Sequence, residues 1–469
     1  MDADPRDLRI QQLEAENQTL RQRIDELEQL LALLRQRIAE LEPLEQIVTS
    51  LQEQVEELQR AAARQAAPFR RKNKDKKPPD QHKRPGRPKG HPPAFRPLPT
   101  QVDEDIEIRL DQCPDCGGPI TNVQRCEQYI EDIPPVRPHV TKLTTYVGTC
   151  QCCGEVRSTH PLQVSTAIGA AGTHLGARAL ALAAWLSKRL GMTTRSVCKV
   201  LQAMFGLKLT PGGLTQALAR MADKLQPTFD VLINDLRCQS GVWVDETSWW
   251  VGGPGWWLWT FTSPDLTVYH VDRSRGRDVV LDMLGQDFAG VLTSDCLASY
   301  ENLPYTMHKC YAHHLKAIAK AQEDQPSDYL AELSGLLKAA IYLQAHRADL
   351  PPPEWAEKRQ HLEDRADELL LRTTPPAGAD KVANRLRKRR RWLFTFLDDP
   401  ALEATNNRAE RSLRPAVIAR KLSCGNKTVR GKRTWEVLTS LAATCHQREQ
   451  DFVEWLSPRL ALATSTPGR

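Results

Sequence analysis

Two aspartates close predicted strands and are the first candidates for chemistry. Asp245 ends the run Gly241-Val-Trp-Val-Asp245, and Asp295 ends the run Gly290-Val-Leu-Thr-Ser-Asp295. Carboxylate oxygens are the ligands that hard cations such as Mg²⁺ or Mn²⁺ take. Two such ions, roughly 4 Å apart, activate an attacking water or 3′ hydroxyl and stabilise the leaving oxygen. The pair therefore indicates phosphodiester chemistry with two metal ions per active site.

A third carboxylate is expected on a later helix that lies beside DNA. Glu410 is the best candidate, because the segment from Arg408 to Arg433 contains nine Lys or Arg residues and no acidic residue other than Glu410. Metal binding next to phosphate contact would explain a lone carboxylate in a basic strip, whereas a solvated helix face normally mixes both signs. A surface glutamate without a ligand is the alternative, and Glu403 is a nearby rival.

Glu246 follows Asp245 directly but points to the opposite face of an extended strand, which disfavours it as a metal ligand. The triad that we predict is therefore Asp245, Asp295 and Glu410. The residues predicted to contact DNA near it share the basic helical segment: Asn406, Asn407, Arg408, Arg411, Arg414, Arg420 and Lys421.

The elements that must position the triad are three strands, a helical segment at 277–284 and a fourth strand. This order resembles the ribonuclease H-like fold, in which the first and fourth strands lie side by side, so that Asp245 and Asp295 would meet. Between Asp295 and Glu410 lie 114 residues, more than one strand and one helix need. A helical insertion at about 320–395 is predicted there.

Four cysteines form two CxxC pairs, Cys113 with Cys116 and Cys150 with Cys153, and glycine follows the second cysteine of each pair. Each tight turn presents two thiolates, so one structural zinc ion is predicted. The intervening strand-like segment 141–147 suggests a ribbon-type hairpin. A pair of reduced turns without metal is the alternative.

The N-terminus has a heptad pattern, with isoleucine prevailing at one apolar position and leucine at the other. Ile10, Ile24, Leu31 and Ile38 occupy the first position with Asn17 among them, and leucines follow three residues later. This pattern favours a parallel two-stranded coiled coil whose register is fixed by the asparagine. A homodimer is predicted, and an amphipathic helix that packs on its own chain is the alternative.

A basic, proline-rich linker follows the heptads, and Arg84, Arg87 and Lys89 are its candidate DNA contacts. Such a segment cannot bury a core and gains affinity by neutralising phosphates. A solvated linker without a partner is the alternative. Further on, Thr193 or Thr194 and then Thr210 with Pro211 could begin successive helices. These helices suggest a helix-turn-helix array, which either reads DNA or simply packs.

Two further groups of residues could take part in function. His308, Cys310 and His313 follow the second aspartate and could position the site or bind metal. Six of the eleven tryptophans fall between Trp243 and Trp259. They could stack on unpaired bases, although filling the core of the sheet is the commoner use of such residues.

Composition excludes several classes of protein. The net charge is only +6, and no apolar run approaches the length of about 18 residues that a membrane span requires. A charged, heptad-patterned N-terminus differs from a secretory signal. We therefore expect a protein that is cytoplasmic and associated with the nucleoid, with no membrane partner.

Several motifs together resemble the transposases of the insertion sequence 66 family. They are the zipper, the Gly-Arg-Pro-Lys-Gly-His linker, the paired CxxC finger, Val244-Asp-Glu-Thr, Ser294-Asp-Cys-Leu-Ala-Ser-Tyr, Cys310-Tyr-Ala-His and Asn406-Asn-Arg-Ala-Glu-Arg. The resemblance implies strand transfer at the ends of the element's own DNA into a target, with possible accessory proteins. It carries the triad roles onto Asp245, Asp295 and Glu410, and includes Cys310 and His313 as a recurring pair.

The predicted chain is thus multidomain α+β. Its parts are a coiled coil (1–60), a basic linker (61–100), a zinc ribbon-like module (101–165), a helical DNA-binding region (166–235), a ribonuclease H-like catalytic core with its helical insertion (236–440), and a C-terminal helix and tail (441–469). A zipper and zinc-finger regulator without catalysis, or a related nuclease, are the alternatives.

Overall fold

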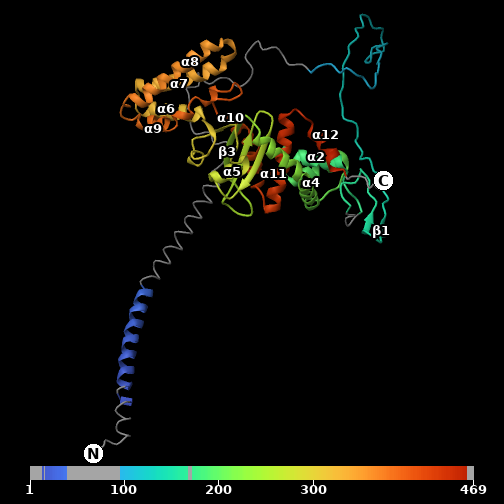
Figure 1. The fold of residues 1–469 in the computed structure, drawn as a ribbon. Coiled ribbons are helices and arrows are strands. Elements are labelled where there is room, and N and C mark those ends of the chain that lie inside the picture. The colour runs from blue at the N-terminus through green and yellow to red at the C-terminus, as the bar shows by residue number, and fades with distance from the viewer. Residues whose placement is uncertain (1–12, 15, 40–95, 167–171, 462–469) are drawn as a thin grey trace, which may run out of the picture. The chain divides into compact units, whose positions relative to one another are not determined.

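The computed structural model describes residues 13–14, 16–39, 96–166 and 172–461 (Figure 1). The chain divides into two units, residues 1–131 and 132–469, and each is described here by itself. Most of the predicted linker, with Arg84, Arg87 and Lys89, lies outside the described residues. Among the described residues, no helix combines the length and the hydropathy that crossing a bilayer requires.

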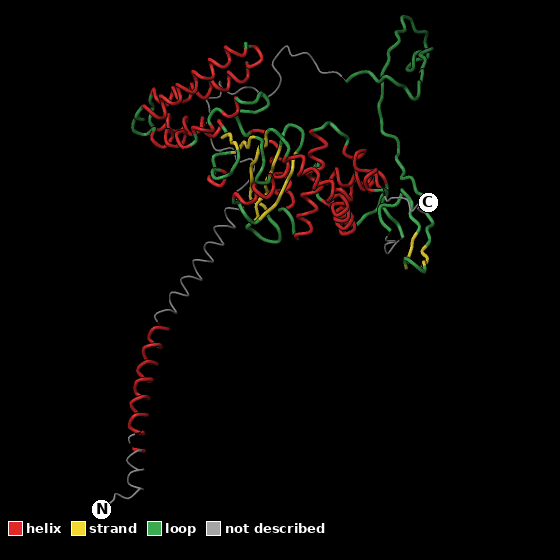
Figure 2. Tube along the Cα trace, viewed as in Figure 1, coloured by secondary structure: helices red, strands yellow, loops and turns green. Residues whose placement is uncertain are grey.

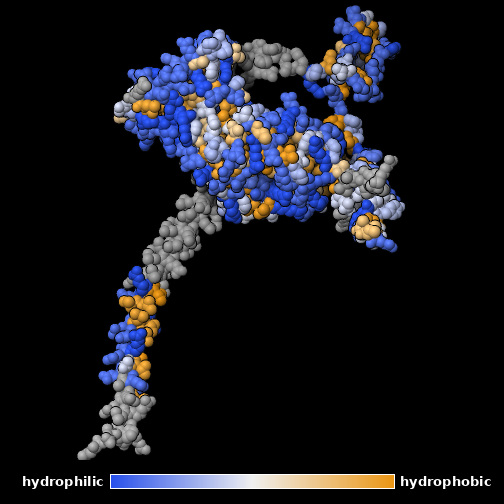
Figure 3. All heavy atoms as spheres, viewed as in Figure 1, coloured by the Kyte–Doolittle hydropathy of each residue, from blue (hydrophilic) through white to orange (hydrophobic). Residues whose placement is uncertain are grey.

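The first unit contains a helix over residues 16–39, as the heptads predict. Its apolar heptad residues are all exposed in the single chain, by 51% to 61% of their surface: Leu20, Ile24, Leu27, Leu31, Leu34 and Ile38. Figure 3 shows apolar side chains gathered along this helix. Residues 96–131 form neither helix nor strand and contain the turn around Cys113.

The second unit is built on a mixed five-stranded sheet with the order β5-β4-β3-β6-β7 (Figure 2). The strands are β3 (Gly241–Trp249), β4 (Trp256–Thr262), β5 (Thr267–Asp272), β6 (Val291–Ser294) and β7 (Thr306–Lys309). β3, β4 and β5 pair antiparallel, whereas β6 lies parallel to β3 and β7 parallel to β6. The prediction that the first and fourth strands of this region are neighbours is confirmed.

Helices that precede, interrupt and follow the strands of the sheet in the chain share one apolar core. They are α2 (Ala177–Lys188), α3 (Thr194–Phe205), α4 (Pro211–Arg237), α5 (Arg277–Leu284), α11 (Val429–Gln447) and α12 (Phe452–Leu460). Thr193 and Thr210 cap α3 and α4 with their side chains, as predicted. The segments that we separated at 235 and 440 therefore contribute to a common core, because α2 and α4 pack on α11 and α12.

Helix α11 covers the edge of the sheet. Thr444, Ser440 and Glu436 recur every four residues along one face of α11, and they accept hydrogen bonds from the backbone N–H groups of Thr267 (3.1 Å), Tyr269 (2.9 Å) and Val271 (2.5 Å) on β5. Alternate residues of a strand direct their N–H groups to the same edge. The polar face of α11 thus replaces the missing neighbour strand and protects the edge.

A helical insertion follows β7, as predicted. It consists of α6 (Tyr311–Asp324), α7 (Asp328–Ala345), α8 (Pro352–Asp367) and α9 (Asp380–Lys388), with short turns η3 (Arg347–Asp349), η4 (Glu368–Arg372), η5 (Arg390–Trp392) and η6 (Thr395–Leu397). Figure 1 shows α6 to α9 side by side. They enclose a second apolar core that reaches Trp243 on β3. The chain then returns to the sheet through α10 (Asn407–Ser423).

The hairpin beside the second cysteine pair is shorter than expected. Strands β1 (Val147–Cys150) and β2 (Gly154–Arg157) pair antiparallel across the Cys150–Cys153 turn. The prediction of a strand over 141–147 is wrong except at Val147, because the partner limb ends at Arg157 and residues 141–146 are exposed and outside any strand. Only the Tyr146–Ser158 backbone pair extends the ladder.

Candidate active site

Asp245 and Asp295 come from neighbouring parallel strands. Trp243 on β3 pairs with Thr293 on β6, and each aspartate stands two residues further along its own chain. The carboxyl ends of parallel neighbours meet at the same edge of a sheet. Asp245 accepts a hydrogen bond from the Glu246 N–H (2.9 Å), and Asp295 accepts one from the Leu297 N–H (2.9 Å). Both side chains are half-buried.

The surroundings of Asp245 disfavour its negative charge. Burial raises the pKa of Asp245 to about 7, and the charges of Glu246, Asp295 and Glu410 add to that rise against the Glu246 N–H, which lowers it. Asp295 and Glu410 are therefore both within electrostatic reach of Asp245. A carboxyl whose pKa is raised by burial and by neighbouring negative charges is a candidate for a functional site, because a bound cation would stabilise its charge.

Glu246 points away from this cluster, as its position in the strand predicts. It is buried, and its Oε1 accepts two hydrogen bonds from Arg275, at 3.0 Å from Nε and 2.8 Å from Nη2. Tyr300 donates its hydroxyl hydrogen to the other carboxylate oxygen. The lone pairs of Glu246 are thus committed to a structural network that fixes β3 to the segments after β5 and β6.

Helix α10 is attached to β3 by Asn406, the residue just before its first turn. The Asn406 side-chain amide donates to the Val244 carbonyl (2.8 Å), and the Asn406 N–H donates to Cys310 Sγ (3.1 Å). Asn406 is only 1% exposed. We expected it to contact DNA, and the structure instead uses it to hold the start of α10 against the sheet. Its short polar side chain satisfies a buried carbonyl one residue before Asp245.

Glu410 and its rival Glu403 differ in their partners. Glu403 forms ion pairs with Arg408 (2.7 Å) and Arg411 (3.8 Å). Glu410 is exposed in the first turn of α10 and has no ion-pair partner among the described residues. A carboxylate whose charge is already balanced is a poorer metal ligand than one that is free. The geometry therefore favours Glu410 over Glu403.

The predicted cations of α10 occupy different environments. Arg411, Arg414 and Asn407 are exposed. Arg408 lies over the Trp243 ring at 5.0 Å. Arg420 donates to Thr247 Oγ1 (3.0 Å) and Ser248 Oγ (2.9 Å), which ties the C-terminal half of α10 to β3. The pKa of Lys421 is lowered by burial and by the charge of Arg420.

Cys310 and the neighbouring histidines lie between β7 and the insertion. Cys310 is buried, where its sulfur accepts the Asn406 N–H. Burial lowers the pKa of His308 to about 4, and His308 Nε2 contacts the Ala404 carbonyl (3.1 Å). His313 Nδ1 is buried with no hydrogen-bond partner within the described chain. These contacts fit a structural part in joining β7 to the segment before α10.

Sequence reasoning missed Lys309, the last residue of β7. Its ammonium is buried and donates to Ser294 Oγ (2.8 Å), next to Asp295. Burial lowers its pKa to about 8, and the charge of Asp295 is among those that oppose this shift. Lys309 also lies near the Tyr300 and Trp392 rings. The only sequence signal was a lysine at the end of a short strand, paired with a strand that ends in aspartate.

The three predicted carboxylates do not form a closed metal site in this arrangement of side chains. Among the described residues, no three His, Cys, Asp or Glu side chains are grouped closely enough to hold a metal ion. The donor chemistry nevertheless fits Mg²⁺ at the triad, because oxygen ligands and unbalanced negative charge are what a hard cation needs. Ligation would require the carboxylates to draw together.

The two CxxC turns have matching local geometry. Cys113 belongs to the first unit and Cys150 to the second, and each is described by itself. Hydrogen bonds from backbone groups two and three residues later lower the pKa of both thiols. Gly117 and Gly154, which follow the second cysteines, have φ of +73° and +74°. Glycine adopts this conformation readily, as the sequence predicts.

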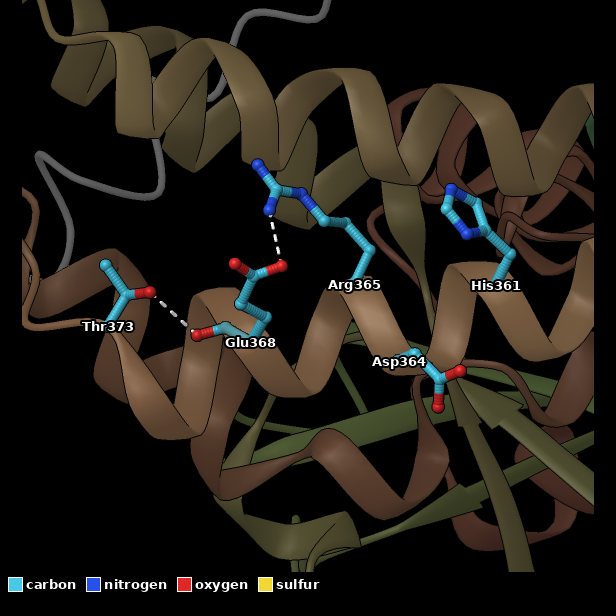
Figure 4. A pocket seen from close by; sticks show the side chains of 5 residues that line it. All are labelled: His361, Asp364, Arg365, Glu368 and Thr373. Carbon is cyan, nitrogen blue, oxygen red and sulfur yellow. Dashed lines mark hydrogen bonds and ion pairs between the residues drawn. The ribbon is translucent and has the colours of Figure 1, made fainter.

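The pocket in Figure 4 lies in the insertion, away from the carboxylates, and is lined by His361, Asp364, Arg365, Glu368 and Thr373. Arg365 and Glu368 point toward each other and form an ion pair (2.5 Å). Thr373 donates to the Glu368 carbonyl (2.8 Å). Three of the pocket's five lining residues thus bond to one another, and the pocket contains none of the predicted site residues.

Comparison with known proteins gives a family match over the part of the chain that contains all three carboxylates. The family described as "Transposase IS66 family" matches residues 172–434, more than half of the chain. Three proteins of Sinorhizobium fredii (strain NBRC 101917 / NGR234) are similar. "Uncharacterized protein y4qI" is 26% identical over 296 residues, which cover 54% of this chain and 53% of that protein. "Uncharacterized protein y4jD" is 25% identical, covering 76% and 75%, and "Uncharacterized protein y4hP" is 24% identical, covering 80% and 75%. The chain thus spans about half the length of the first relative and three quarters of the other two.

Proposed function

Since this chain belongs to the IS66 family of transposases, we propose that it cleaves DNA and joins the cut end to a target at a metal site formed by Asp245, Asp295 and Glu410. The observation that carries the proposal is that the charges of Asp295 and Glu410 both act on the buried Asp245 carboxyl. Asp245 belongs to β3, Asp295 directly follows the parallel neighbour β6, and Glu410 belongs to the helix attached to β3. Burial raises the pKa of Asp245 to about 7, and the charges of Asp295 and Glu410 add to that rise.

Divalent ions bound there would activate the attacking oxygen and stabilise the leaving oxygen. The residues of the chain do the positioning. Asp245 and Asp295 offer oxygens from the rigid sheet, and Glu410 offers one from the first turn of α10. Arg411 and Arg414, exposed on the same helix, would neutralise phosphates of the bound strand. Asn406 and Glu246 keep β3 and α10 in place through their buried bonds.

The core is proposed to be ribonuclease H-like. The strand order β5-β4-β3-β6-β7, with an antiparallel half and a parallel half, supports this proposal. Asp245 then belongs to the first strand of the fold, and Asp295 follows the fourth. The helices α6 to α9 form the insertion before the third carboxylate.

The remaining parts of the chain are proposed to serve DNA binding and assembly. One zinc ion would be held by Cys113, Cys116, Cys150 and Cys153, a proposal that the lowered thiol pKa values of Cys113 and Cys150 support. The helix at 16–39 would pair with its copy in a second chain. The basic linker and the α2–α4 helices would contact the terminal repeats of the element, with target DNA and possible accessory proteins as the further partners, in association with the nucleoid.

The test is cleavage and strand transfer on DNA that carries the ends of the element, with Mg²⁺ or Mn²⁺ and, where needed, accessory proteins. Asp245→Asn, Asp295→Asn and Glu410→Gln are each expected to lower the rate on the order of 10³-fold with DNA binding retained, because a metal contributes several kcal/mol and each 1.4 kcal/mol is tenfold. Glu403→Gln is the matched control and should stay active.

The outcomes separate the alternatives. A wild-type chain that binds the ends and never cuts them would favour a DNA-binding regulator. If Glu410→Gln alone stays active while Glu403→Gln is inactive, the third ligand is Glu403. Cleavage without joining, on any DNA, would favour a nuclease of the same fold.

A further inference from the structure

Trp250 is the one member of its tryptophan group that the fold leaves exposed. Trp243, Trp249 and Trp259 are buried in the core, and Trp256 and Trp257 are half-buried. Trp250, directly after β3 at the tip of the β3–β4 hairpin, is 43% exposed. The core interpretation of these tryptophans is therefore confirmed for the buried three, and Trp250 needs another explanation.

The backbone of Trp250 is held firmly although its side chain faces solvent. The loop between α10 and α11 forms a bridge to the hairpin: the Asn426 N–H donates to the Trp250 carbonyl (2.8 Å), and the Gly252 N–H donates to the Asn426 carbonyl (2.9 Å). Asn426 Oδ1 also accepts from Trp249 Nε1 (2.8 Å). The approach is close enough that a Cβ added at Gly425 would lie 2.6 Å from the Trp250 carbonyl oxygen. An aromatic ring on a fixed backbone loses little entropy when it binds a ligand.

The charges around this hairpin tip are positive. Arg420 bonds to Ser248, two residues before Trp250. Lys427 is exposed in the same loop as Asn426. Between Glu410 and Glu436 the chain carries eight Lys or Arg residues and no acidic residue. A flat apolar face beside cations matches a nucleobase next to its phosphates, since every base has a π-face and the contact tolerates any sequence.

Strand β3 connects this surface to the carboxylates. Asp245 and Trp250 are five residues apart, which corresponds to roughly 16 Å along an extended strand. That span equals roughly five stacked nucleotides at 3.4 Å each. Helix α10 follows the same strand, from Asn406 beside Val244 to Arg420 beside Ser248 (Figure 1). Exposed Arg411 and Arg414 on α10 and Lys427 in the loop after it thus accompany the strand that joins the carboxylates to the exposed indole.

We propose that Trp250 stacks on an unpaired base of the DNA strand within about five nucleotides of the scissile phosphate, and that this contact holds the frayed or cut end in place. The proposal rests on the proposed function for the identity of the substrate. A second copy of the chain is the competing occupant, because Ile418 and Leu422 on α10 and Val429 on α11 are also exposed. The surplus of cations favours DNA.

The experiment uses the full chain without divalent metal, so that binding is measured apart from cleavage. The DNA is an element end with either a paired terminus or five unpaired nucleotides, in which 2-aminopurine is placed at each unpaired position in turn. Trp250→Ala is expected to weaken binding of the unpaired DNA at least about fivefold, since stacking is worth about 1–3 kcal/mol per base. It should also abolish the quenching of 2-aminopurine at one position. Trp250→Phe should retain most of both.

The controls isolate the stacking contact. Leu422→Ala removes an exposed apolar side chain near the C-terminal end of α10. It should change neither the affinity for unpaired DNA nor the quenching of 2-aminopurine. An abasic residue at the quenched position should make wild type and Trp250→Ala bind equally. Fully paired DNA should also be bound equally by both.

Equal binding of unpaired DNA by wild type and Trp250→Ala, with 2-aminopurine quenching unchanged, would overturn the proposal. So would a loss of self-association in Trp250→Ala with DNA binding intact, which would assign the ring to a second copy of the chain. The binding assay requires no cutting, so the stacking proposal can be supported even if the cleavage assay contradicts the proposed triad. The triad can equally hold while stacking fails.

Discussion

Asp245 on β3 and Asp295 directly after β6 occupy the same level of two neighbouring parallel chain segments, since each stands two residues beyond the Trp243–Thr293 pair. The strands that carry them are buried, and Val244 and Leu292 have no exposed surface. A one-residue slip of either strand would turn its apolar residues toward the wrong face. The packing of the core therefore fixes the register of the two aspartates.

Metal occupancy of this site can be mapped without measuring catalysis. Fe²⁺ that replaces Mg²⁺ generates hydroxyl radicals in the presence of ascorbate and peroxide, and these cut the backbone close to the bound ion. Fragments should end near Asp245, Asp295 and Glu410 in the wild type and disappear in Asp245→Asn. Excess Mg²⁺ should suppress them. Cuts confined to the cysteine turns, or unchanged by Asp245→Asn, would contradict a metal site at the triad.

Much of the sheet could be predicted because its signals are local. The alternation and the turn residues around β3 to β6, and the helix at 277–284, appear directly in the sequence. The pairing of β3 with β6 was predicted only from the resemblance to a known fold, since periodicity alone does not reveal which strands are neighbours. The helical insertion could be inferred from the length of chain between Asp295 and Glu410.

The contacts that position the carboxylates could not be predicted from local signals. The sequence indicates only that Asn406 is a polar residue at the start of a helix. The tertiary structure shows that its side-chain amide donates to the Val244 carbonyl. Lys309 and Ser294 meet across two strands. The bonds from α11 to β5 join residues more than 160 positions apart. Such pairs carry no sequence pattern, because each partner is satisfied only after the chain has folded.

The Glu246–Arg275 pair should contribute to stability. Removing one partner leaves a buried carboxylate with only the Tyr300 hydroxyl. Arg275→Met is therefore expected to lower the free energy of unfolding on the order of 2 kcal/mol, below the range for a fully buried pair because the Arg275 side chain is 44% exposed. Urea unfolding followed by tryptophan fluorescence measures it.

The neighbouring Arg277→Met is the control for that measurement. It breaks an exposed pair with Asp278 and should change stability by less than about 1 kcal/mol. Equal effects of the two substitutions would refute the structural role of Glu246 and reopen it as a candidate ligand.

The contact between α11 and β5 predicts a pH dependence of stability. Burial raises the pKa of Glu436 to about 7, although Lys432 and the Val271 N–H lower it. Between its ordinary value of 4.5 and 7 the folded chain keeps a proton that the unfolded chain releases. The stabilising contribution of this group is therefore complete below pH 4.5 and is lost as the pH rises through 7.

Glu436→Gln removes that dependence and keeps an acceptor for the Val271 N–H. The difference in unfolding free energy between Glu436→Gln and wild type should rise by on the order of 2 kcal/mol, in favour of the variant, from pH 5 to pH 7.5. Urea titrations at both values give the difference. Glu454→Gln, at an exposed position, should show no such gain. A constant difference between wild type and Glu436→Gln at the two pH values would show that the carboxyl is ionised throughout.

Zinc content tests the paired cysteine turns. A chain purified without chelator should carry about one zinc ion by atomic absorption if, as proposed, two thiolates from each turn form a tetrahedral site. Cys113→Ser combined with Cys150→Ser should remove it. Cys126→Ser and Cys152→Ser are matched controls and should retain it. Zinc that depends on Cys126 or Cys152 would mean that a different set of thiols binds the metal.

The exposed heptad residues of the helix at 16–39 predict the state of association. Burying each leucine or isoleucine against a second helix contributes about 1.5–3 kcal/mol, and these side chains have no cover within their own described unit. Ile24→Glu with Leu27→Glu should therefore reduce the mass measured by light scattering from two chains or more to one. Gln22→Glu with Gln29→Glu adds the same charge on the outer face of the helix and should leave the mass unchanged. If both double variants keep the wild-type mass, association depends on another surface. If the wild type is already a single chain, the exposed heptad residues do not pair with a second copy.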